Sequence, residues 1–316
     1  MDLRPVHRRP VMTATVLGRW DPGSPEWHAA RAHGVGGSEV AAVVGCSPFE
    51  SRFSLWHRKA ALVGPVDETP EMEWGKRLEP AIAAKFRDEH PELSFDRTGF
   101  TFAHEDRPWQ IANPDLYGDA LVEVKCSRDG LGWGEPGTDQ VPIYYRQQVL
   151  WYCDVLDAPG AHIAVLVGGN DYREYHVPYD ATEAAELRGH VEAFLGTLER
   201  HERPDIDAHT ATYQVVRELH PDIDGTDVEV DDLLAARFTL ARRQVAQAEA
   251  AEQYARNLIA DAMGTARRAR WEGKTVATRQ ARGEGIPYLV AGRALPDLSD
   301  FHPSTLTTLT EQEPAA

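Results

Sequence analysis

Two carboxylates and a lysine lie close together near the middle of the chain. Asp115 follows a proline, and Glu123 and Lys125 come eight and ten positions later. Alternate residues of a β-strand face one side, so Glu123 and Lys125 share a face while Val122 and Val124 face the core. Asp115, in the turn before this strand, can return beside Glu123. The spacing predicts two carboxylates and an ammonium group that converge on one point.

Such a cluster suits the hydrolysis of a phosphodiester. Asp115, Glu123 and the backbone carbonyl of Val124 provide hard oxygen ligands for Mg²⁺, with Mn²⁺ as a substitute. The metal orients and acidifies a water and neutralises charge on the phosphate, and Lys125 holds that water or steadies the phosphate. Short patterns of this kind also arise by chance, and the alternative is an exposed strand pair of Glu123 and Lys125.

Five further residues can join this cluster. Glu79, on an expected helix, supplies a third carboxylate, or is a solvated or capping residue before the next proline. Ser38 follows a glycine-rich stretch whose amides can hold a phosphate at a helix start, or is a plain N-cap. Arg31 can pair with the same phosphate. Tyr145 and Gln148 share a helical face, where packing is the default role.

These residues require both helices and strands to position them. Helical periodicity predicts helices over 21–63 (broken by the glycines at 34–37), 74–90, 142–156 and 181–201. Short strands are expected near 95 and at 99–102, 109–111, 121–125, 162–167 and 173–177. The mixture predicts the α/β (α+β) class for this part of the chain.

The composition changes after Pro204. A heptad pattern fits 234–259, but Glu252 occupies one seam position, so a single amphipathic helix or a helical hairpin is equally consistent. Six basic residues follow, around an expected hairpin at Gly273, and a solvated face is a commoner role for them than a DNA contact: Arg267, Arg268, Arg270, Lys274, Arg279 and Arg282. We expect a flexible tail at 1–20, a catalytic domain at 21–205, a helical C-terminal region at 206–300 and a disordered tail at 301–316.

The bulk composition narrows the class of protein. A net charge of -17 argues against a protein that coats nucleic acid, but an enzyme can concentrate positive charge in one groove. Cys46, Cys126 and Cys153 are scattered and odd in number, which predicts neither a disulfide framework nor a zinc site and favours a cytoplasmic location. We expect no membrane span and no signal peptide, because no long apolar stretch occurs.

From Trp27 to Tyr179 the chain resembles the YqaJ-type viral recombinase family, phage-type nucleases related to the phage lambda exonuclease, with a PD-(D/E)XK core. The matching motifs occur in the family's order: Arg31 with Gly34-Val35-Gly36-Gly37-Ser38-Glu39, Gly45-Cys46-Ser47-Pro48-Phe49, Trp74-Gly75 with Leu78-Glu79-Pro80, Asn113-Pro114-Asp115, Glu123-Val124-Lys125, and Pro142-Ile143-Tyr144-Tyr145-Arg146-Gln147-Gln148-Val149. Motifs in this order are far more specific than any one of them alone.

The resemblance implies a restriction-endonuclease-like core, with a central mixed sheet flanked by helices. It implies Mg²⁺ at Asp115 and Glu123, with Glu79 near a second metal position, and Lys125 as the catalytic lysine. The remaining implied roles are phosphate or DNA contacts for Arg31, Ser38 and Tyr145, and a place in the site for Gln148. The scattered cysteines argue against the iron–sulfur cluster of some related exonucleases.

The function implied is a Mg²⁺-dependent exonuclease that acts on linear double-stranded DNA ends, 5′ to 3′, in phage or prophage recombination. Lambda-like members leave 3′ single strands for an annealing protein and form a ring of three subunits. The motifs do not cover the region after 205, so a homo-oligomer is expected without a stated subunit number. The alternatives are an endonuclease with the same site and a non-catalytic protein that binds DNA ends or a partner.

Overall fold

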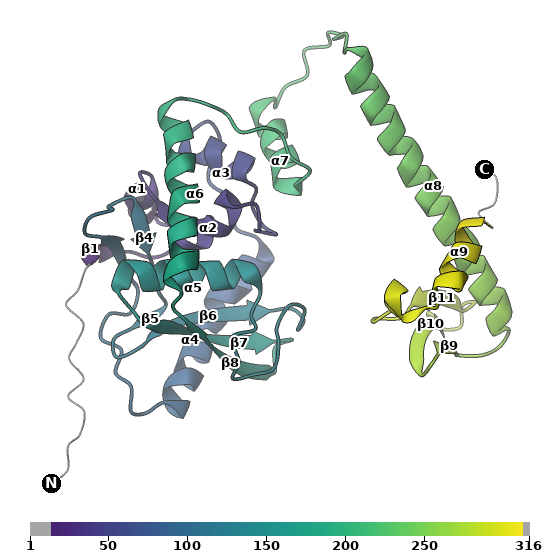
Figure 1. Ribbon diagram of the computed structural model, residues 1–316, viewed down its shortest axis with the longest axis horizontal. Coiled ribbons are helices and arrows are strands. Elements are labelled where there is room, and N and C mark those ends of the chain that lie inside the picture. Colours follow the sequence, from purple (N-terminus) through teal and green to yellow (C-terminus); the bar gives the residue numbers. More distant parts are fainter. Residues whose placement is uncertain (1–13, 312–316) are drawn as a thin grey trace. The chain divides into compact units, whose positions relative to one another are not determined.

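The computed structural model describes residues 14–311, which divide into two compact units, the first ending at Ile223 and the second beginning at Asp224 (Figure 1). The strands of the first unit are β1 (Ala14–Arg19), β2 (Val35–Gly36), β3 (Phe100–His104), β4 (Gln110–Ala112), β5 (Leu116–Tyr117), β6 (Leu121–Ser127), β7 (Gly160–Val167) and β8 (Asp171–Pro178). Its helices are α1 (Pro25–Arg31), α2 (Gly37–Val43), α3 (Arg52–Lys59), α4 (Pro70–Glu89), α5 (Ile143–Leu156), α6 (Ala181–Glu199) and α7 (Thr210–Leu219).

The strands of the first unit form two four-stranded sheets, in the orders β1-β3-β4-β2 and β5-β6-β7-β8. In the second sheet β6 and β7 are parallel, with Glu123 opposite Ile163, and the outer pairs are antiparallel. Parallel neighbours need a crossover connection, and α5 lies in the segment that provides it. The expected mixed sheet flanked by helices is confirmed, although the strands divide between two sheets.

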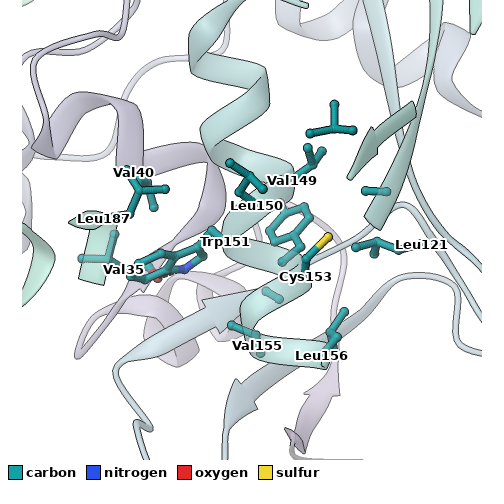
Figure 2. Packing of buried hydrophobic residues seen from close by; sticks show 14 of the residues in the cluster. Val35, Val40, Leu121, Val149, Leu150, Trp151, Cys153, Val155, Leu156 and Leu187 are labelled. Atoms are coloured by element: carbon teal, nitrogen blue, oxygen red, sulfur yellow. Dashed lines mark hydrogen bonds between the residues drawn. The ribbon is translucent and has the colours of Figure 1, made fainter. Parts of the chain in front are cut away.

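Helices cover the β5–β8 sheet. Ile82 and Phe86 of α4 pack against Val122 and Val124, so the apolar residues of β6 face α4 as strand alternation predicts. A second core surrounds α5, and Figure 2 shows its leucine, valine and tryptophan side chains gathered around that helix. In that core the buried Trp151 indole donates to the carbonyl oxygens of β2 and β4 at 3.1 and 3.2 Å, which ties α5 to the other sheet.

The second unit contains α8 (Asp232–Met263), β9 (Arg268–Trp271), β10 (Lys274–Gln280), β11 (Tyr288–Ala291), a 3-10 turn (Leu298–Asp300) and α9 (Pro303–Glu311). Its strands form an antiparallel sheet in the order β11-β10-β9. The expected hairpin at Gly273 is confirmed: Glu272 and Gly273 both have positive φ, 44° and 81°, as a tight hairpin requires. The basic segment after α8 is therefore a small sheet.

Several expected boundaries differ from the structure. Part of the expected N-terminal tail is β1, which pairs with the edge of β3, and α9 lies in the expected C-terminal tail. The first unit extends past 205 because α7 packs on α3, where Thr212 Oγ1 donates to Ser51 Oγ at 2.7 Å. Segments 1–13 and 312–316 of the expected tails lie outside the described residues. Between residues 14 and 311, no helix is long and apolar enough to cross a membrane.

Helix α4 also begins earlier than the periodicity predicts. Thr69 caps the backbone N–H of Met72 and Pro70 occupies the first turn, so the helix starts four residues before Trp74. Segment 94–99, where a strand was expected near Phe95, contains no strand. The earlier start of α4 arises because capping chemistry, rather than hydrophobic period, sets the first turn of that helix.

Candidate active site

Glu123 lies at the centre of a buried polar cluster on β6. Its Oε1 accepts hydrogen bonds from Lys125 Nζ and from Gln148 Nε2 of α5, both at 2.6 Å. Its Oε2 is buried and has no hydrogen-bond partner among the described residues. A carboxylate oxygen removed from water without a partner is costly, so this atom marks a position that a cation can satisfy.

Asp115 and Glu79 approach Glu123 from different elements. Asp115 precedes β5, and its Oδ2 accepts the backbone N–H of Val124 at 2.7 Å. Burial raises the pKa of Asp115 well above its usual value, and the charges of Glu123 and Glu79 raise it further. Burial and Glu123 also raise the pKa of Glu79, which lies on α4 immediately before Pro80. Three carboxylates therefore share one poorly hydrated region.

The donor set fits a divalent cation held partly by water. No three His, Cys, Asp or Glu side chains in the described part of the chain are arranged to hold a metal by themselves. Mg²⁺ usually takes only one or two carboxylates and keeps several waters, so Asp115 and Glu123 suffice as protein side-chain ligands. The unpaired Oε2 of Glu123 and the mutual repulsion with Asp115 and Glu79 both favour added positive charge.

Lys125 is the ammonium group of the cluster. Burial alone would lower its pKa, but the charges of Glu123 and Asp115 outweigh burial and raise it, so the side chain is a cation at neutral pH. Its Nζ also lies 4.9 Å from the centre of the Tyr145 ring, within the range of a cation–π contact. The shared face of Glu123 and Lys125 is therefore a buried ion pair rather than an exposed strand pair.

Helix α5 fixes the amide of Gln148. Gln148 Nε2 reaches both Glu123 Oε1 and the hydroxyl of Tyr152, the latter at 3.0 Å. Tyr152 is buried one turn further along, and sequence reasoning missed it because its hydrophobic neighbours gave it the appearance of plain core. A Cβ on Gly37 would lie 2.5 Å from the Tyr152 ring and 2.9 Å from the Gln148 carbonyl oxygen. The absence of a side chain at Gly37 therefore allows the start of α2 to pack directly against α5.

A second cluster surrounds Arg31 at the end of α1. Its guanidinium donates to Ser38 Oγ at 3.1 Å and lies 4.1 Å from the Trp27 ring centre, so the two expected phosphate-binding residues do meet. Arg31 is only 6% exposed, and its Nε has no partner among the described residues. A Cβ on Gly36 would lie 2.4 Å from this guanidinium. The glycine thus leaves room for Arg31 beside the start of α2.

Glu39 and Lys59 hold Arg31, and the sequence offered no role for either. Glu39 Oε2 lies 3.3 Å from the Arg31 guanidinium and accepts the Gly36 N–H at 2.7 Å. Lys59 Nζ lies 2.9 Å from Glu39 Oε1 and donates to the Arg31 carbonyl oxygen at 2.9 Å. Burial would raise the pKa of Glu39, but Lys59 and Arg31 outweigh it and lower the pKa to about 2. The one sequence signal for this pair was that Glu39 is the last residue of the Gly34–Glu39 family motif.

A cavity of about 630 Å³ opens beside the carboxylates. Glu79 and Asp115 line it together with Trp27 of α1, so it lies next to both clusters. It is large enough for a mononucleotide-sized group, by comparison with ligand pockets of a few hundred cubic ångströms.

Comparisons with known proteins place this site in context. Residues 26–159 match the model of the YqaJ-like viral recombinase domain. The chain is 24% identical over 249 residues to the uncharacterized protein YqaJ of Bacillus subtilis (strain 168), covering 74% of this chain and 76% of that protein. Two solved structures are also similar. One is an alkaline exonuclease from Laribacter hongkongensis, with 24% identity, a TM-score of 0.48, and coverage of 57% of this chain and 94% of that chain. The other is a phage-related exonuclease from Haemophilus somnus 129PT, with 12% identity, a TM-score of 0.39, and coverage of 59% and 96%.

Proposed function

We propose that the chain, whose residues 26–159 match the YqaJ-like viral recombinase domain, is a metal-dependent nuclease that degrades linear double-stranded DNA from its ends. The observation that supports this most directly is Glu123, with one oxygen fixed by Lys125 and Gln148 and the other buried without a partner. The expected family resemblance is confirmed. Mg²⁺ dependence, attack on DNA ends and 5′ to 3′ polarity are our proposals.

Asp115 and Glu123 would hold Mg²⁺, with the backbone carbonyl of Val124 as a third protein ligand and Glu79 near a second metal position. When bound, the metal supplies an activated water and neutralises charge on the scissile phosphate. Lys125 is positioned to hold that water or to donate to the phosphate oxygens as charge builds on them. Gln148 keeps the Glu123 carboxylate oriented, and the Tyr145 ring limits where the Lys125 ammonium can lie.

Arg31 and Ser38 would bind a DNA phosphate. The buried Nε of Arg31 is a charged donor without a partner among the described residues, and a phosphate oxygen is the acceptor that guanidinium groups pair with best. Ser38 lies in the first turn of α2, where backbone N–H groups favour an anion. A terminal 5′-phosphate held at this place would set the scissile bond beside the carboxylates and give 5′ to 3′ polarity.

In this proposal the product is a 3′ single strand for an annealing protein during phage or prophage recombination. That role rests on the family resemblance rather than on any surface of the chain.

The test compares three substrates in Mg²⁺: a linear duplex with 5′-phosphates, the same duplex with 5′-hydroxyls, and a closed circular duplex. We expect the phosphorylated linear duplex to be degraded fastest and the circle to survive. Loss of the circle would indicate an endonuclease. No degradation of any substrate in Mg²⁺ or Mn²⁺ would favour a non-catalytic protein that binds DNA ends.

A further inference from the structure

The long helix α8 has an apolar face that no other described element of the second unit covers. Figure 1 shows the small sheet near the C-terminal end of α8, where β9 contacts the helix, and away from its N-terminal half. From Asp232 to Leu258 every residue of α8 is exposed, including Leu234, Phe238 and Val245 at 53%, 69% and 46%. Large apolar side chains along a helix of this length usually mark a surface that another element covers.

The exposed residues follow a seam with alternating spacings of four and three. One set of seam positions contains Phe238, Val245, Glu252 and Ile259, and the other contains Leu234, Ala241, Ala248 and Ala255. The first set is mostly bulky and the second mostly alanine. Two such helices fill each layer of their interface evenly when the bulky set of one faces the alanine set of the other.

A parallel, in-register pair fails this requirement. It would place each seam residue against its own copy, so Glu252 would face Glu252 and three layers would contain only alanine. At the flank, Arg237 would lie beside Arg242 of the other helix. Like charges and underfilled layers both oppose this arrangement.

An antiparallel pair of α8 helices, centred between residues 246 and 247, places the bulky set of each helix against the alanine set of the other. Each layer then combines the two sets: Leu234 with Ile259, Phe238 with Ala255, Ala241 with Glu252, and Val245 with Ala248. Antiparallel pairing brings the same flanking position of both helices together, so Arg242 of one helix lies opposite Glu249 of the other, twice per pair.

The distribution of charge along α8 also favours antiparallel pairing. The N-terminal half of α8 contains three basic residues and one acidic residue: Arg237, Arg242, Arg243 and Asp232. The C-terminal half contains three acidic residues and one basic residue: Glu249, Glu252, Asp261 and Arg256. The two halves are therefore oppositely charged. Because the order reverses in an antiparallel partner, a second copy of α8 presents the complementary charge along its whole length.

We propose that α8 pairs antiparallel with α8 of a second copy of this chain, with Phe238 and Val245 in the seam and Arg242–Glu249 ion pairs at its flank. The apolar side chains Leu233, Leu240 and Tyr254 widen the same face on its alanine side. This surface belongs to the second unit and the nuclease site to the first, and the proposed pairing does not depend on the proposed reaction.

The test is the self-association of the full chain by sedimentation equilibrium, at low salt, with charge-reversal variants. Arg242→Glu and Glu249→Arg should each weaken the dimer about tenfold, because each turns two attractive contacts into repulsive ones. The double variant should restore it. Arg243→Glu, the same charge change at a position facing away from the seam, is the matched control and should leave association unchanged.

The sign of the Arg242→Glu effect also distinguishes orientation. In a parallel pair this change would relieve the Arg237–Arg242 repulsion and tighten the dimer, which would overturn the proposal. A chain that remains monomeric at all concentrations would overturn it as well. So would an oligomer whose mass and dissociation constant are the same for the wild type and for all four variants, because that oligomer would form through another surface.

Discussion

The buried Glu39 carboxylate offers a test of how the phosphate-binding residues are held. Glu39→Gln keeps the side chain's shape and removes its charge. The amide can still accept the Gly36 N–H, but Lys59 and Arg31 then face each other without a carboxylate between them. Both cations have side chains only 7% exposed, so water does not replace the lost charge.

The size of the effect follows from the pKa of Glu39, which is lowered from 4.5 to about 2. A difference of about 2.5 pKa units corresponds to roughly 3 kcal/mol of folding free energy. Because the folded-state pKa is the lower one, this stability is fully present above about pH 4.5 and is lost as pH falls through about 2. Burial lowers the pKa of Lys59 by more than the charge of Glu39 raises it, so the protonation of Lys59 adds no stability at neutral pH. The stability that we attribute to the cluster therefore comes from the ionised Glu39 carboxylate.

Urea unfolding of the wild type and Glu39→Gln at pH 7 and at pH 3.5 measures this directly. We expect Glu39→Gln to be less stable by about 3 kcal/mol at pH 7 and by about 2 kcal/mol at pH 3.5, because at pH 3.5 the unfolded wild type already binds the proton while the folded protein does not. Glu105→Gln, in an exposed loop, is the control and should change neither value. A difference below about 1 kcal/mol at pH 7, or one that grows on acidification, would refute the ion-pair account.

Three further predictions concern the site and its support. Lys125→Ala should abolish DNA cleavage while the circular dichroism spectrum stays unchanged; substantial residual nuclease would remove Lys125 from the catalytic group. Gly37→Ala should destabilise the chain by about 1–3 kcal/mol in thermal unfolding, because its Cβ would overlap the Tyr152 ring. Gly189→Ala in α6 has open space and should stabilise by up to about 1 kcal/mol; equal effects would contradict the close approach at Gly37. Chelation should stop cleavage and added Mg²⁺ or Mn²⁺ should restore it, and activity in excess chelator would exclude the proposed metal.

Local pattern predicted the part of the site that lies on one strand. Alternation along β6 correctly separated Glu123 and Lys125 from Val122 and Val124, because the side-chain period of a strand needs no knowledge of distant contacts. The hairpin at Gly273 followed in the same way from a residue that tolerates positive φ.

What the sequence did not predict depends on contacts between distant segments. Lys59 reaches Glu39 across 20 positions and Arg31 across 28, and a lysine in an amphipathic helix gives no sign of such a partner. The pairing of β1 with β3 joins segments more than 80 residues apart, so β1 resembled a tail. Thr212 on Ser51 extended the first unit past its expected end for the same reason.

The central claim is that the cluster around Glu123 cleaves DNA, and Glu123→Gln tests it most directly. The substitution keeps the side chain's volume and removes its negative charge. The amide oxygen can still accept from Lys125 and Gln148, and Asp115 still provides Lys125 with a negative charge, so the fold should persist, which circular dichroism checks. We predict at least about a hundredfold slower degradation of a linear duplex in Mg²⁺ than for the wild type and for Glu105→Gln. A folded Glu123→Gln protein that degrades the duplex at the wild-type rate would contradict the account.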